Sequence, residues 1–210
     1  KVARPLNEVP ASVVPISGDT LTSLKLFDAK DIVSVAPGLD VNTASPNNTI
    51  PSMRGMTFDP FSGVSPTVNL YWNELSIDAG SAFRAMYDLG QVEVLRGPQG
   101  TLRSGSAPGG AVLFSTRKAD LNDHSASVQL SASNQNLFNT QLTTNIVLMK
   151  GKLALRLAGL YDGNDANYAH NVITGFDSRS HTRSIRATLT WKPNENINVN
   201  LVHQYLYQSK

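Results

Sequence analysis

The sequence lacks cysteine altogether among its 210 residues. A disulfide scaffold, a thiolate metal site and a cysteine nucleophile are therefore excluded. Neither sign of charge is in large excess, because 18 basic side chains are balanced by 16 acidic ones and the net charge is only +2. So small an excess does not by itself favour a nucleic-acid partner, and we predict none.

Long hydrophobic runs are missing as well. The longest, such as residues 146–149, extend over a few positions, whereas a membrane-spanning helix needs ~18 apolar residues. The N-terminus carries no apolar run of the signal-peptide type, so we expect the chain to begin as a mature protein or inside a longer one. A membrane β-barrel remains open, since its strands need only ~9–11 alternating residues.

The composition changes near Lys118. Residues 1–118 carry most of the proline and glycine. They predict one short helix capped by Asp19, a second helix over about 27–35, and strands at 49–53, 67–72, 91–95 and 111–115. We interpret this half as a compact α+β domain with many loops.

Residues 119–210 have a different pattern, in which apolar and polar side chains alternate. The alternation runs through 125–134, 138–149, 152–162, 183–192 and 195–208, and indicates five antiparallel strands. Tight turns alternate with a long loop, as in an outer-membrane barrel. A soluble sandwich would give the same alternation. Because a closed barrel needs ~8 strands and lipid does not tolerate an open edge, we favour part of a longer barrel.

Residues 91–118 hold the glycine-rich segment that most resembles a functional motif. Gly100 and Gly105 have the GxxxxG spacing of a phosphate-binding loop, but Ser106 stands where that loop needs lysine. Pro108 and the glycines after it would break the helix that must follow. The four histidines show no metal-binding spacing, and no serine, histidine and carboxylate set is evident. We therefore predict neither an enzyme nor a bound cofactor or metal.

The same segment reads QVEVLRGPQGTLRSGSAPGGAVLFSTRK and resembles the plug-domain signature of TonB-dependent outer-membrane receptors. Other pieces agree in order: Val9-Pro10, residues 31–39, Met53-Arg54-Gly55 and Tyr87-Asp88-Leu89. The resemblance covers about residues 8–118. It departs from the family at Arg103-Ser104, at residues 71–74 and at Met53.

This resemblance implies an α+β plug followed by antiparallel strands of a transmembrane β-barrel. The chain would hold the plug and the first five or so strands of a ~22-stranded barrel in the cell outer membrane. Such a receptor takes up a scarce nutrient, such as a ferric siderophore, and contacts outer-membrane lipid. It is energised by the TonB-ExbB-ExbD complex, although the family's coupling box is not visible in this chain. The alternative is a soluble β-sandwich binding or adhesion module with a glycine-rich cap.

The resemblance also suggests site residues. Arg54 and Arg96, with Glu93 nearby, would anchor the plug to carboxylates of the barrel wall, because a buried arginine must be paired. Arg103 at the plug apex would bind an anionic substrate, since a guanidinium holds carboxylate or phosphate in a two-pronged hydrogen bond. The remaining candidates for the apex are Phe58, Phe61, Ser104 and Ser106.

Overall fold

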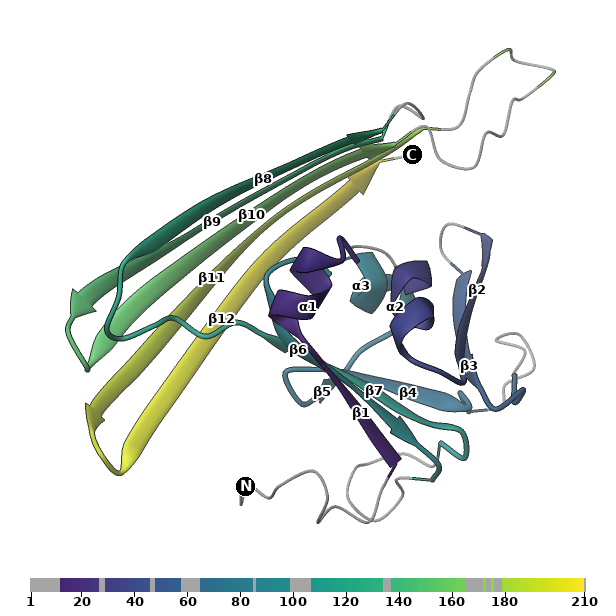
Figure 1. Cartoon of the computed structure of the whole chain (residues 1–210), viewed down its shortest axis with the longest axis horizontal. Helices are drawn as coiled ribbons and strands as arrows, with labels where there is room; N and C mark the ends of the chain where they lie inside the picture. Colours follow the sequence, from purple (N-terminus) through teal and green to yellow (C-terminus); the bar gives the residue numbers. More distant parts are fainter. Residues whose placement is uncertain are drawn as a thin grey trace. The chain divides into compact units, whose positions relative to one another are not determined.

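The computed structural model describes residues 12–26, 29–45, 48–57, 65–84, 86–98, 107–133, 137–164, 172, 175 and 179–209. The chain divides into two compact units, residues 1–117 and 118–210. Figure 1 labels the helices and strands of both. No helix in the described part of the chain is long and apolar enough to cross a membrane.

The larger sheet of the first unit has the strand order β1-β6-β7-β4-β5. These strands are β1 (Ser12–Ser17), β4 (Val68–Trp72), β5 (Leu75–Ser76), β6 (Leu89–Arg96) and β7 (Gly110–Thr116). β4 runs parallel to β7, and the other neighbours are antiparallel. A separate hairpin pairs β2 (Leu39–Ser45) with β3 (Asn48–Met53).

The core of this unit lies between the sheet and its helices. Helices α1 (Gly18–Ser23), α2 (Ala29–Val35) and α3 (Ala79–Arg84) lie on one face of the larger sheet (Figure 1). They bury Leu21, Ile32 and Phe83 against alternate residues of β6 and β7. The ring of Phe114 is central, because Trp72 stacks on it at 5.6 Å between centroids and Phe83 meets it edge-on at 5.7 Å.

Helix α1 starts one step earlier than we expected. Ser17 is its N-cap and accepts a hydrogen bond from the Thr20 N–H at 3.1 Å, so the assignment of Asp19 as the cap is wrong. Asp19 lies in the first turn instead. That leaves its carboxylate free to reach another part of the unit.

The second unit is an antiparallel meander. Its strands follow one another in sequence order as β8 (Ser125–Ser133), β9 (Leu137–Met149), β10 (Leu153–Asn164), β11 (Ser180–Asn194) and β12 (Ile197–Ser209). The last four are 12 to 15 residues long. All five strands were predicted from the alternation, but β10 and β11 extend further into the predicted loop between them than expected.

Candidate functional site

The sheet of the second unit has its polar face buried and its apolar face exposed. In β11 the buried positions are Ser180, Thr182, Ser184, Arg186, Thr188 and Thr190. Between them, Ile185 is 56% exposed and Trp191 is 45% exposed. This is the reverse of a water-soluble sheet, in which the buried face is apolar.

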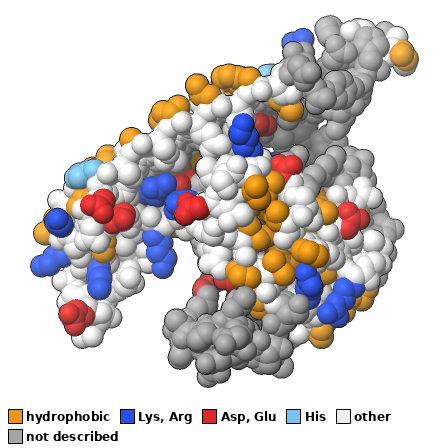
Figure 2. Space-filling model, in the orientation of Figure 1, with side chains coloured by type: hydrophobic (Ala, Val, Ile, Leu, Met, Phe, Trp, Pro, Cys, Tyr) orange, Lys and Arg blue, Asp and Glu red, His pale blue; other side chains and the backbone are white. Residues whose placement is uncertain are grey.

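The neighbouring strands repeat this pattern on the same face. Figure 2 shows hydrophobic side chains along one surface of these strands. The exposed apolar residues there include Val128, Leu130, Leu142, Ile146, Leu148, Leu201, Tyr205 and Tyr207. A contiguous apolar surface of this kind marks contact with a partner or a membrane. The observation argues against the soluble sandwich.

The apolar face has the height of a lipid-facing band. Aromatic side chains lie toward both ends: Trp191 pairs with Leu153 near the tight turns, and Tyr161 lies at the other end. From Leu153 to Tyr161 is eight residues (161 − 153 = 8) along β10. At ~3.3 Å per residue and a tilt of ~40°, that is about 20 Å, near the ~25 Å apolar band of an outer-membrane barrel.

The aromatic cluster at the far end also contains a cation. The guanidinium of Arg183 lies 5.6 Å from the centre of the Tyr161 ring. Phe138 and His181 contact the same ring at 6.2 and 6.4 Å between centroids. Aromatic and basic side chains are the residues that favour a membrane–water interface.

The polar face is linked by side-chain hydrogen bonds across the strands. Arg186, which is 1% exposed, donates from Nε to Gln204 Oε1 at 2.9 Å. Asn139 donates to the Asp162 carboxylate at 2.8 Å, and Gln141 donates to Asn139 at 3.1 Å. A buried face this polar suits the aqueous lumen of a barrel.

One end of the polar face also fixes the segment that follows the first unit. Asn145, 1% exposed, donates to the carbonyl oxygens of Asp120 and Asp123 at 3.0 and 2.7 Å and accepts from the Asp120 N–H at 2.9 Å. Thr190 Oγ1 accepts from the Ala119 N–H at 3.2 Å. The Asn145 amide thereby uses both of its N–H donors and one of its two oxygen lone pairs on this segment.

The predicted anchoring arginines lie near one another in the first unit. Arg54 follows β3, is exposed and has φ 55°. Arg96 ends β6 opposite Gly110, and Gly110 lies against the Met53 side chain. The Nε of Arg96 is buried with no hydrogen-bond partner. Glu93 is on the opposite face of β6, since Val92 and Val94 face the core, so the structure does not bring it together with Arg96.

The predicted apex residues Phe58, Phe61, Arg103, Ser104 and Ser106 lie outside the described residues, as do Gly100 and Gly105. Their roles stay predictions. The segment itself leads into β7, which begins at Gly110. A strand in place of a helix disfavours the phosphate-binding loop. Among the described residues, no three metal-ligating side chains gather into a site.

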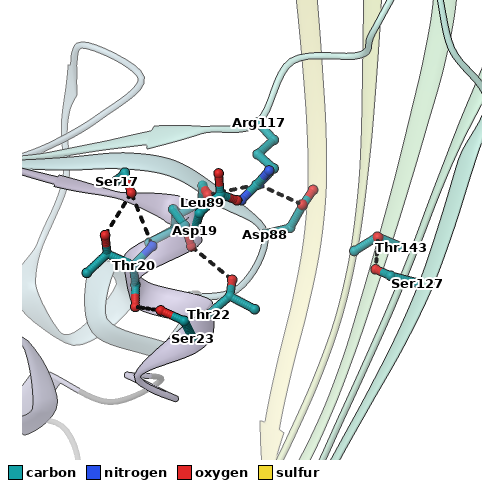
Figure 3. Close-up of polar contacts among 11 residues, drawn as sticks. Ser17, Asp19, Thr20, Thr22, Ser23, Asp88, Leu89, Arg117, Ser127 and Thr143 are labelled. Carbon is teal, nitrogen blue, oxygen red and sulfur yellow. Dashed lines mark hydrogen bonds and ion pairs between the residues drawn. The ribbon is translucent and has the colours of Figure 1, made fainter.

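Sequence reasoning missed a polar cluster around Arg117, drawn in Figure 3. Its guanidinium donates to the Asp19 carboxylate at 2.5 Å and to the Leu89 carbonyl at 3.2 Å, and lies 3.9 Å from Asp88. Arg117 holds the pKa of Asp19 below its ordinary value, first by the hydrogen bond and then by its charge. Asp19 and Arg117 are 98 residues apart, so no local motif signals their contact.

These features fit a plug-and-barrel protein of the outer membrane, and comparison with known proteins agrees. Residues 5–111, about half of the chain, match the TonB-dependent receptor plug domain. The chain belongs to this family. The predicted family, the plug-and-barrel fold and the outer-membrane location are thereby confirmed.

Relatives of known function resemble it over most of its length. The ferrichrome outer membrane transporter and phage receptor of Escherichia coli (strain K12) is 26% identical over 204 residues, 94% of this chain. The pesticin receptor of Yersinia pestis is 29% identical over 182 residues, 85% of this chain. The chain spans about a quarter, 26%, of each of these proteins.

Solved structures show the same fold. The ferric yersiniabactin uptake receptor of Yersinia pestis superposes with a TM-score of 0.85 at 21% identity, over 94% of this chain and 32% of that one. The alcaligin outer membrane receptor of Bordetella pertussis gives a TM-score of 0.74 at 18% identity, over 97% of this chain and 33% of that one.

Proposed function

We propose that this chain provides the plug and the first barrel strands of an outer-membrane receptor that imports a scarce nutrient, such as a ferric siderophore. The plug closes the pore, its apex contributes to nutrient binding, and its displacement admits the nutrient. The TonB-ExbB-ExbD complex supplies the energy. The matched relatives act as receptors and transporters, and we propose no catalytic step.

The observation that carries this proposal is the reversed sheet. An apolar face about 20 Å tall and an opposite face of buried hydroxyl, amide and guanidinium groups suit lipid on one side and a water-filled lumen on the other. Among the matched proteins, one transports ferrichrome and another takes up ferric yersiniabactin, which supports a siderophore as the nutrient class.

Plug anchoring by Arg54 and Arg96, with Glu93 as a further contact, is part of the proposal. The buried Nε of Arg96 supports it, because an unpaired buried guanidinium nitrogen is costly and gains from a carboxylate. Glu93 faces away from Arg96 and would need a separate cation.

The direct test is uptake of radioactive iron by the full-length receptor, expressed in cells that lack their own siderophore receptors. A panel of hydroxamate, catecholate and carboxylate siderophores is supplied with and without a functional TonB. We expect uptake of at least one complex, dependent on TonB. Membranes that contain the folded receptor but bind none of the panel would refute the siderophore assignment.

Arg103 offers a test of the substrate's charge. If it binds an anionic group, Arg103→Ala should weaken binding of the transported ligand about tenfold or more, because a charged hydrogen bond is lost. Arg103→Lys retains the charge without the two-pronged geometry and should give an intermediate affinity. Equal affinities of all three proteins, measured by titration, would exclude Arg103 as an anion site. The other apex candidates, Phe58, Phe61, Ser104 and Ser106, are tested by the same titration.

A further inference from the structure

Strand β1 is an edge strand of the plug sheet. It pairs with β6 alone, from Ser12 opposite Arg96 to Ser17 opposite Gln91. β6 keeps β7 on its other side. Of the side chains of β1 that can be described, Ile16 alone is buried. β1 can therefore leave the sheet without breaking any other strand pair.

Helix α1 follows β1 directly. Its first residue packs closely against the backbone of β6, and an ion pair holds its first turn. A Cβ at Gly18 would lie 1.9 Å from the Leu89 carbonyl oxygen, so the helix starts tightly against the backbone that leads into β6. One residue later, the Asp19 carboxylate accepts from Arg117. Leu21 adds one buried apolar side chain.

Arg117 is itself firmly held. Its own N–H donates to the Asp88 carbonyl at 3.1 Å, and the preceding Thr116 donates from both N and Oγ1 to the Asn73 side chain, at 3.0 and 3.2 Å. The chain that follows is hydrogen-bonded to β9 through Asn145. The ion pair thus joins a weakly held edge segment to a fixed residue.

We propose that residues 12–23, comprising β1 and α1, form a releasable segment of the plug that the Asp19–Arg117 ion pair holds closed. Force applied on the N-terminal side of β1 separates its pairs with β6 in turn and then meets this ion pair. Once it breaks, α1 leaves and β6 gains an open edge, while β6, β7 and β4 stay paired. This inference rests on the proposed function, in which a coupling complex pulls on the plug.

The test is amide hydrogen exchange of the full-length receptor in lipid bilayers, with Asp19→Asn compared with the native protein. We expect exchange in residues 18–23 to rise, by up to about fivefold on the scale of an exposed ion pair. Exchange in β7 and β4 should not change. Asp19→Glu keeps the charge and should restore most of the protection. Arg117 is left unaltered, because its guanidinium also lies near the buried Asp88 carboxylate and donates to the Leu89 carbonyl, so its loss would change more than the ion pair.

Three further variants complete the design. Gly18→Ala should raise exchange in residues 12–23 more than tenfold, since its Cβ would overlap a backbone oxygen. Gly90→Ala is the matched control, because the nearest atom to its Cβ is 3.4 Å away. Asp40→Asn controls for loss of an exposed charge elsewhere in the unit.

The outcomes distinguish a failure of the releasable segment from a failure of the proposed transport function. Exchange in Asp19→Asn equal to that in Asp40→Asn would overturn the role of the ion pair. Faster exchange spread equally over β6 and β7 would overturn the separate segment. Iron uptake is measured in parallel: faster exchange in 18–23 with no uptake of any siderophore refutes the transport function and leaves the releasable segment standing.

Discussion

At the scale of single residues, position 110 of the plug requires glycine for two separate reasons. Its φ of 142° is one that other residues rarely adopt, and a Cβ there would lie 2.1 Å from the Leu95 carbonyl oxygen. We expect Gly110→Ala to lower the free energy of unfolding by about 2–4 kcal/mol, through backbone strain and overpacking. Gly90→Ala should have little effect.

Amide hydrogen exchange of the full-length receptor in urea measures this change. Phe114 lies in the plug core, where Trp72 stacks on it, so exchange in β7 reports unfolding of the plug. Urea midpoints within error of each other for Gly110→Ala and Gly90→Ala would contradict the prediction.

Asp19 makes the stability of the plug depend on pH in a defined direction. Its pKa is lowered by Arg117, so the native state binds this proton less readily than the unfolded state. The stabilising contribution is therefore present above the ordinary carboxyl pKa and is lost as the pH falls through the lowered native value. Asp88, 3.9 Å from the same guanidinium, also faces this pair.

We expect the difference in exchange between the native protein and Asp19→Asn in residues 18–23 to be constant from pH 5 to 7. It should shrink progressively below about pH 4. The rates are corrected for the intrinsic pH dependence of exchange. A difference that persists unchanged to pH 2 would show that the carboxylate is not the group responsible.

At the scale of elements, the end of α1 offers a stabilising substitution. The Leu26 N–H donates to the Leu21 carbonyl at 2.8 Å and the Lys25 N–H to the Thr22 carbonyl at 3.2 Å, which is the Schellman arrangement. Lys25 holds its left-handed position with φ 55° and an exposed side chain. Lys25→Gly should stabilise the helix by about 0.5–1 kcal/mol.

The measurement is again exchange in residues 18–23, which should slow by about twofold to fivefold in Lys25→Gly. Lys25→Ala is the control, since alanine has the same difficulty at positive φ as lysine. Equal rates in the glycine and alanine variants would mean that the backbone conformation at this position has no influence on α1.

How far the sequence predicts the elements depends on how much periodic signal each one contains. β11 has 15 residues of alternation, and its existence follows from pattern alone. β1 has six residues including Pro15, and α3 has six with no apolar period, so neither was predicted. Capping also depends on geometry: Ser17 and Asp19 are both good caps, and only the path of β1 into α1 decides between them.

The candidate site is less predictable than the fold for a similar reason. The motif around Arg96 identifies the family, and the alternation identifies both faces of the barrel strands. The Asp19–Arg117 contact joins residues 98 positions apart, and the three hydrogen bonds of Asn145 go to backbone atoms. Backbone donors and acceptors leave no mark in the sequence.

At the scale of the whole molecule, the two faces of the barrel strands must differ in how much an added charge destabilises them. Leu142 and Thr143 are adjacent in β9, and their side chains lie on opposite faces. Leu142 is 53% exposed on the apolar face, in the row between Val128 and Gly159. Thr143 hydrogen-bonds to Ser127 on the polar face at 2.7 Å.

A lysine at each position in turn tests which face of the sheet meets lipid and which meets water. Leu142→Lys should lower the free energy of unfolding from lipid bilayers by about 1–2 kcal/mol, because Leu142 pairs with Gly159, two residues from the Tyr161 end of the apolar band, and the cost of a cation falls from the middle of the lipid face toward its edge. Thr143→Lys should cost less than half as much, because its ammonium group reaches the lumen. Urea unfolding of the full-length receptor from vesicles, followed by loss of its β-sheet circular dichroism, provides both values. Equal losses would mean that Leu142 does not face lipid, and the assignment of the exposed apolar face would have to be withdrawn.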